Sequence, residues 1–465
     1  MKSGMMLILP FILLLFVVGS LPAFSAEETT GLLPEQEATL RAIAKGEMEK
    51  WIPMTQVQAR ALDQKADAQW QELHKYLLPF GQVVDVYWPD KTQTTPLRYE
   101  TVGDSACWTG HYLAALAFRY KATKDPEVLQ KVKDVLDVFD SLTKVSGRTG
   151  YIARFAGPAD DGPYREYYKV YGRGEDPERP GLGKWAYRGG GPYTNLVWLG
   201  NSSRDTYIGF NLGISAAWAN VDNREVRAKI KEIVTTVGNR MMEDNWSVID
   251  GKGHTTRPTP TFKLSWMRTI ATAAPDKFPD VVREYGESIG AALKTPRRTY
   301  PKTYKEYFAN NLGFATAYSL YAMETDPALK RQLAGSIRDM YNGVKDHLNA
   351  HFAMIYLAAT GDKNETALAT ATGQLIDIPG PPRWFRAVDY RNDPDKKLLD
   401  GGERLEHALL AHEQVPSDFL WQRSPTVSHG ASDAAYETPG LDLLLPYWMG
   451  RANGIIAGSK DMPSK

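Results

Sequence analysis

The fold is decided by residues 105–144, which read S-A-C-W-T-G-H-Y-L-A-A-L-A-F-R-Y, then K-A-T-K-D-P-E, then V-L-Q-K-V-K-D-V-L-D-V-F-D-S-L-T-K. The first part is apolar nearly all round and rich in small residues, as a helix packed on every side must be. Asp125, Pro126 and Glu127 form a strong helix start, because Asp caps a helix and Pro fits its first position. The last part is amphipathic. This stretch therefore predicts a buried helix, a very short turn and an amphipathic helix.

The same unit recurs along the chain. Further pairs are predicted at 205–220 with 223–243, 261–274 with 278–293, 308–324 with 327–347, and 350–360 with 363–375, after two opening helices at 34–50 and 56–78 and before a last apolar helix at 440–456. Each helix buries what its neighbour exposes, which is typical of a closed double ring of helical hairpins. An open α-solenoid would show more uniform repeats and polar caps. We expect an all-α fold of about six hairpins, an (α/α)6 toroid.

Long connections precede most of the buried helices, whereas the turns inside the pairs are short. The long segments are 146–204, 244–260, 294–307 and 376–439. Connections of this length are uncommon unless they are functional. In a toroid they would lie at the end where the inner helices begin, and the helix dipoles make that rim electropositive. We expect the functional site there.

The N-terminus is typical of a secretory signal. Lys2 precedes an apolar run of about fourteen residues from Met5 to Val18, and Ala23-Phe24-Ser25 fits a cleavage site. The run is shorter than the roughly twenty residues that a membrane span needs, although a retained anchor is the alternative. We expect a signal peptide at 1–26, one toroid domain at 27–456 and a flexible tail at 457–465. The mature protein would be exported, periplasmic or extracellular, without stable membrane insertion.

Composition excludes some functions and restricts others. The 55 basic and 55 acidic residues balance, which argues against nucleic acid as a partner, because sequence-independent binding needs a basic surplus. Cys107 is the only cysteine, so an internal disulfide is impossible, and its apolar neighbours predict a buried thiol. His407 and His412 lack metal-site spacing, and the stretch 403–413 reads as a solvated amphipathic helix. We expect neither a metal nor another cofactor.

Four motifs follow one another along the chain. They are G-D at 103–104 ahead of W-T-G at 108–110, G-R-T-G at 147–150 ahead of A-R at 153–154, S-S-R-D-T-Y at 202–207 ahead of Gly209, and L-L-P-Y-W-M-G-R at 444–451. Their order resembles that in exported bacterial proteins of the six-hairpin glycosidase-like superfamily, over roughly residues 100–456. The resemblance implies the toroid and a carbohydrate substrate more than a particular reaction. Relatives usually carry an acidic residue directly after the position of Asp205, where this chain has Thr206.

Two carboxylates are the catalytic candidates. Cleaving a glycosidic bond needs an acid for the leaving oxygen and a carboxylate that acts as base or nucleophile. Asp104 and Asp205 stand at the starts of two buried helices and would face the same cavity. Both also stand where a structural N-cap belongs. The residues expected to contact the sugar are Trp108, His111, Arg154, Arg204, Tyr207, Trp266, Asn311 and His351, of which the aromatic residues and His111 also suit a core.

The loops leave the substrate and the reaction open. Arg148, Arg154, Arg188 and Arg204 lie in or beside 146–204, and a guanidinium suits the carboxylate of a uronic acid, unless nearby acidic residues pair with it. A hydrolase is the leading hypothesis. A polysaccharide lyase on the same scaffold is the alternative, with roles for Asn310, Asn311, Tyr207, His351 and His429. A non-catalytic glycan-binding protein is the third.

Overall fold

The computed structural model describes residues 31–47, 50–171, 174–294, 306–399, 402, 404–415, 422–427 and 432–458. The predicted signal peptide and most of the predicted tail lie outside these residues. The described part is mainly helical, with fourteen α-helices and four small antiparallel sheets. The prediction of a predominantly α protein is therefore confirmed.

Five of the predicted helical hairpins are present. The pairs are α3 (Ser105–Thr123) with α4 (Pro126–Leu142), α6 (Arg204–Asn220) with α7 (Arg224–Glu243), α8 (Pro260–Ala273) with α9 (Pro279–Lys294), α10 (Phe308–Met323) with α11 (Pro327–Asn342), and α12 (Ala350–Thr360) with α13 (Glu365–Asp377). They follow α1 (Pro34–Ala44) and α2 (Gln56–Tyr76) and precede α14 (Leu441–Ala452), which continues through Pro446. The turn chemistry explains the boundaries, because Asp125 accepts the N–H of Glu127 at 2.8 Å and Pro126 begins α4.

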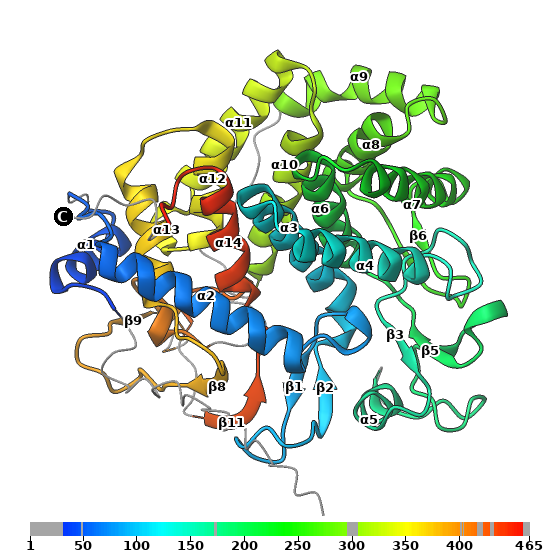
Figure 1. Ribbon diagram of the computed structural model, residues 1–465, viewed down its shortest axis with the longest axis horizontal. Coiled ribbons are helices and arrows are strands. Elements are labelled where there is room, and N and C mark those ends of the chain that lie inside the picture. The colour runs from blue at the N-terminus through cyan, green and yellow to red at the C-terminus, as the bar shows by residue number, and fades with distance from the viewer. Residues whose placement is uncertain are drawn as a thin grey trace, which may run out of the picture.

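The apolar helices pack on one another and the amphipathic helices cover them. Helix α3 lies between α14 and α6, α6 packs on α10, and α12 contacts both α10 and α14. Figure 1 shows these five helices towards the middle, with α2, α4, α7, α9, α11 and α13 around them. Residues 105–118 of α3 are all buried, as the apolar sequence predicts. The largest part of the core therefore lies between these helices.

Helices α3 and α6 approach each other through glycines. A Cβ atom on Gly209 would lie 2.5 Å from the Cys107 carbonyl oxygen, and one on Gly213 would lie 2.6 Å from the Gly110 carbonyl oxygen. Side chains at these positions would push the two backbones apart. Because Cys107 and Gly209 each lie about one turn inside their helices, this contact brings the first turns of α3 and α6 together.

The long connections carry the strands. In the main sheet, β1 (Asp85–Tyr87) lies between β2 (Arg98–Glu100) and β11 (Ser432–Glu437), and β8 (Trp384–Ala387) lies beyond β11. The smaller sheets contain β3 (Ala156–Pro158), β5 (Leu196–Leu199) and β4 (Ala186–Arg188); β6 (Val248–Ile249) and β7 (Thr255–Thr256); and β9 (Leu398–Leu399) and β10 (Arg404–Leu405). The main sheet lies below the helices in the view of Figure 1.

A pair of acidic side chains meets at the end of β11, an inner strand of the main sheet. Glu437 is fully buried at the end of β11 and accepts hydrogen bonds from Trp88 Nε1 at 2.9 Å and Gln93 Nε2 at 2.8 Å. The same amide of Gln93 donates to Glu72 of α2 at 2.5 Å. Burial, together with the neighbouring carboxyl of Glu72, raises the pKa of Glu437 to about 8. This carboxyl is therefore largely protonated at neutral pH.

One sequence prediction about the fold is wrong. The stretch 403–413 is not an amphipathic helix, because its described residues form β10 and a 3-10 turn at Ala411–Glu413. Spacing of charged residues alone did not reveal that this segment pairs with β9.

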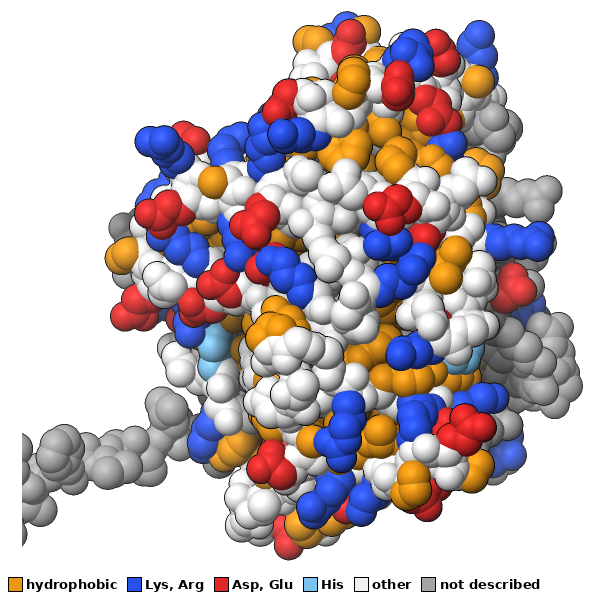
Figure 2. All heavy atoms as spheres, turned by 90° about the vertical axis from the view of Figure 1, so that its right-hand side faces the viewer, with side chains coloured by type: hydrophobic (Ala, Val, Ile, Leu, Met, Phe, Trp, Pro, Cys, Tyr) orange, Lys and Arg blue, Asp and Glu red, His pale blue; other side chains and the backbone are white. Residues whose placement is uncertain are grey.

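None of the described helices is long and apolar enough to cross a membrane. On the face drawn in Figure 2, basic and acidic side chains are interspersed.

Candidate active site

Asp104 is held by an arginine at the start of α3. It occupies the N-cap position but makes no capping hydrogen bond with its side chain. Its carboxylate instead receives Arg154 Nη1 at 3.1 Å. Arg154 is fixed by two further bonds, to the carbonyl oxygens of Gly103 at 2.6 Å and Asn201 at 2.9 Å. The side chain of Asp104 remains 39 % exposed, so its carboxylate is oriented and still accessible.

Asp205 lies one residue inside the start of α6 and does not cap it. The cap is Ser203, whose Oγ accepts the N–H of Thr206 at 3.4 Å. Burial raises the pKa of Asp205, and the negative charge of Asp104 raises it further, while Arg154 and Arg204 partly offset both effects. The two carboxyl groups are therefore close enough for the charge of Asp104 to affect the pKa of Asp205, and neither side chain caps its helix.

The environments of these two carboxyl groups differ. Asp104 is ion-paired with the guanidinium of Arg154, whereas burial raises the pKa of Asp205. Paired carboxyls in different environments are the arrangement from which acid and base roles arise. The effect of Asp104 on the pKa of Asp205 shows that the two carboxyl groups are neighbours.

Tyr171 is a neighbour of this pair that the sequence did not single out. It follows α5 (Gly162–Val170), and a Cβ on Gly103 would lie 2.8 Å from its hydroxyl oxygen. Burial raises the pKa of Tyr171, Arg154 lowers it and Asp104 raises it, so the phenol is close to both. The tyrosines at 164, 167, 168 and 171 have helical spacing, which was the available signal.

Six predicted sugar contacts are buried. Trp108, His111, Tyr207, Trp266, Asn311 and His351 are each at most 2 % exposed. The Tyr207 hydroxyl accepts the N–H of Ile152 at 3.0 Å, and Trp266 packs against Tyr207 and Phe210. A sugar-stacking role for Trp108 and Trp266 is not supported, because neither ring presents a face to solvent. The remaining contacts, Arg154 and Arg204, lie beside the carboxyl pair.

The buried histidines meet inside the bundle. The rings of His111 on α3 and His351 on α12 are 6.3 Å apart. Burial lowers the pKa of His111 to about 4 and lowers that of His351 well below its usual value. Both are neutral at physiological pH, but their burial removes them from direct contact with a polymer. Of the other lyase candidates, Asn310 is also buried and His429 lies outside the described residues.

A small concavity lies at the start of α12, away from the carboxyl pair. Its volume is about 30 Å³, and its lining includes Asn349, His351, Gln374 and Asp442. Asp442 is bound by both terminal nitrogens of Arg383, with 2.8 Å between Nη2 and Oδ2. Burial lowers the pKa of Arg383 to about 9, against the opposing effect of Asp85, so it remains a cation at neutral pH. This ion pair is fully enclosed and reads as structural.

Two of the four arginines predicted to bind an acidic sugar are bonded to other groups of the protein. Arg148 is bonded to Asp244 and to the carbonyl oxygen of Ile249, and Arg154 is bonded to Asp104. Arg188 and Arg204 are exposed. The prediction of uronic acid recognition therefore rests on these two side chains.

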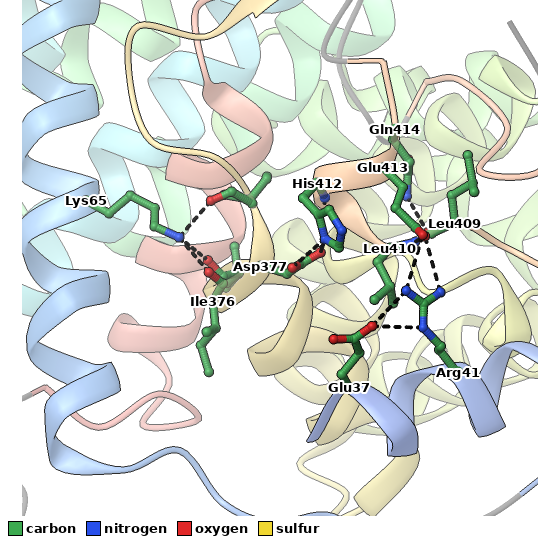
Figure 3. Close-up of polar contacts among 12 residues, drawn as sticks. Glu37, Arg41, Lys65, Ile376, Asp377, Leu409, Leu410, His412, Glu413 and Gln414 are labelled. Carbon is green, nitrogen blue, oxygen red and sulfur yellow. Dashed lines mark hydrogen bonds and ion pairs between the residues drawn. The ribbon is translucent and has the colours of Figure 1, made fainter. Parts of the chain in front are cut away.

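The histidines and glutamates near residue 410 are bound to other side chains. His412 Nδ1 lies 2.8 Å from Asp377 Oδ1, and Glu413 is paired with Arg41 at 3.2 Å (Figure 3). Glu413 is also paired with Lys396 at 2.7 Å. The bond to Asp377 raises the pKa of His412 against the effect of burial. In the described part of the chain, no three His, Cys, Asp or Glu side chains are grouped closely enough to hold a metal ion.

No family model matches this chain. A search of curated proteins also finds no significant match. The function must therefore be argued from the geometry of the site.

Proposed function

We propose that this chain is an exported glycoside hydrolase built on an (α/α)6 toroid. The scaffold proposal is supported by the chain of contacts from α14 through α3, α6, α8, α10 and α12 back to α14, and by the amphipathic helices outside them. Such a ring brings the starts of its inner helices to one end. Export is supported by the sequence pattern of residues 1–26.

Asp205 is the general acid and Asp104 is the base or nucleophile. The single observation that carries these roles is the opposed environment of two neighbouring carboxyls, neither of which caps its helix. An acid must hold its proton until the leaving oxygen takes it, which a raised pKa favours. A base or nucleophile must be ionised, which Arg154 favours. This is the pair of groups that glycosidic cleavage requires.

The substrate is an oligosaccharide or polysaccharide fragment that enters beside the 146–204 segment. Arg204 is exposed next to Asp205 and is the side chain best placed to bind a substrate hydroxyl or a uronate carboxylate. Tyr171 presents a phenol beside Asp104. Its raised pKa keeps it protonated at neutral pH, so it serves as a hydrogen-bond donor.

Hydrolysis of a glycan panel by the purified protein tests the proposal. We expect new reducing ends from the wild type, and at most about a thousandth of that rate from Asp205→Asn and from Asp104→Asn, because general acid–base catalysis contributes 10²–10⁴-fold. Asp222→Asn is the matched control, since Asp222 is an exposed carboxylate between α6 and α7. It should keep full activity.

The reaction products separate this proposal from its alternatives. A lyase would give unsaturated uronates that absorb in the ultraviolet, and a glycan-binding protein would give no product at all. Full activity in Asp205→Asn would refute the acid role. Ultraviolet-absorbing products would refute hydrolysis itself.

A further inference from the structure

A row of aromatic rings begins beside the carboxyl pair. Tyr167 stacks on Tyr171 with 5.3 Å between ring centroids, Tyr171 meets the edge of Trp185 at 5.3 Å, and Trp185 meets His254 at 6.1 Å. The Tyr167 hydroxyl accepts the N–H of Gly103, the residue before Asp104. The row therefore runs outward from the start of α3 along the 146–204 segment. We call Tyr171, Trp185 and His254 the aromatic row.

The three members of the aromatic row are only half-buried, unlike the tryptophans of the core. Tyr167 is 8 % exposed and supports the row from behind. The Nε1 atom of Trp185 is buried and has no hydrogen-bond partner among the described residues. A large aromatic side chain with an exposed part and an unsatisfied donor is an unusual surface feature, because buried indole N–H groups are usually paired.

The hairpin of β6 and β7 fixes His254 at the end of the row. Asp250 accepts the N–H groups of Lys252 at 2.7 Å and His254 at 3.1 Å, and its Oδ2 binds His254 Nδ1 at 2.6 Å. Gly251 and Gly253 supply the φ values of +70° and +102° that the turn needs. The hairpin loop is therefore built around the imidazole.

The hairpin is also connected to the carboxyl pair. Asp250 Oδ2 accepts the N–H of Asn201 at 3.1 Å, and the carbonyl oxygen of Asn201 accepts Arg154 Nε at 2.9 Å. Arg154 in turn holds Asp104. Burial would raise the pKa of Asp250, but the bonds from Lys252, His254 and Asn201 outweigh it and lower the pKa. Asp250 Oδ2 thus orients the imidazole of His254 through its Nδ1 atom, and Nε2 on the other side of the ring is available to a ligand.

We propose that the aromatic row is a sugar-binding subsite next to Asp104 and Asp205, so that the substrate is a chain longer than a disaccharide. This inference rests on the proposed function. The apolar face of a pyranose ring packs on the exposed parts of Trp185 and Tyr171, and His254 Nε2 binds one of its hydroxyl groups. Asp250 is a positioning residue that orients the imidazole.

Binding of oligosaccharide ladders tests the subsite. We would measure Kd by calorimetry for cello-, xylo-, manno- and galacturono-oligosaccharides of two to six residues, using Asp205→Asn protein to prevent hydrolysis. In this background we expect affinity to rise with chain length. Adding Trp185→Ala should remove that rise and weaken hexasaccharide binding by about tenfold, which corresponds to about 1.4 kcal/mol. Trp185→Phe should recover part of the loss.

Trp218→Ala is the matched control, because Trp218 is also half-buried but lies near the opposite end of α6 under Arg227. It should leave every Kd unchanged. Binding with an unchanged length dependence in Trp185→Ala would overturn the subsite and leave the proposed function intact. If the wild type hydrolyses no glycan and the Asp205→Asn protein binds none of these ladders, the proposed function fails and the subsite fails with it.

Discussion

Replacing Gly209 by alanine tests how the site is assembled. A Cβ atom there would lie 2.5 Å from the Cys107 carbonyl oxygen and from its Sγ, whereas ordinary contacts begin at 3.4 Å. Helices α3 and α6 must therefore separate by about 1 Å, because backbone atoms cannot yield as a flexible side chain would. Overpacking of this kind costs about 1–3 kcal/mol of the free energy of unfolding.

The same displacement reaches the carboxyl pair. Asp205 lies four residues before Gly209, and Asp104 lies three residues before Cys107, so both are within about one turn of the strained contact. A misplacement of about 1 Å can reduce catalysis by about a hundredfold. We therefore expect Gly209→Ala to lose both stability in urea denaturation and most of its hydrolytic rate.

Gly290→Ala in α9 is the matched control. No atom lies within 4 Å of the Cβ position at Gly290, which is exposed in the middle of a helix. Alanine should stabilise the protein there by up to about 1 kcal/mol, because it is the better helix former. A Gly209→Ala protein as stable and as active as the wild type would refute the link between this helix contact and the site.

Three further results are expected. The pKa of Glu437 is about 8 in the folded protein and 4.5 in the unfolded chain, so the folded state holds an extra proton between these pH values. The free energy of unfolding should therefore fall as the pH rises from about 4.5 through 8. Urea denaturation at pH 5, 7 and 9 should show a smaller fall for Glu437→Gln than for the wild type. Arg204→Gln should move the alkaline limb of kcat/KM to higher pH, because Arg204 lowers the pKa of Asp205, and an unmoved limb would contradict Asp205 as the acid. Cys107 is 2 % exposed and its buried thiol has a raised pKa, so a thiol reagent should label it only after unfolding, and rapid labelling of the native protein would contradict that burial.

Local signals predicted the helices well because each helix pair carries its own helix-start residues. Asp125 with Pro126 and Asp326 with Pro327 mark helix starts without reference to any distant residue. The stretch 403–413 lacked such signals, and its strand forms only because β9 supplies a partner. Its charged residues therefore suggested a helix that does not exist.

The candidate site was predictable only in part. Asp104 and Asp205 were found because each stands at the start of a buried helix, but their freedom from capping depends on Arg154 and Ser203. Trp108 and Trp266 look like platforms in the sequence, and only packing reveals that they are enclosed. Trp185 and His254 became candidates through contacts across separate loops, which no local pattern encodes.

The pairing of β1 with β11 has a consequence for biogenesis. The N–H of Trp88 bonds to the carbonyl oxygen of Ala435 at 2.8 Å, and α14 covers α3. Segments that are synthesised early can therefore pack only after the C-terminal segments have been synthesised. Contacts of such sequence separation slow folding and leave apolar surface uncovered in the interim. A nascent chain of this kind therefore has a long window in which chaperones can hold it before it folds.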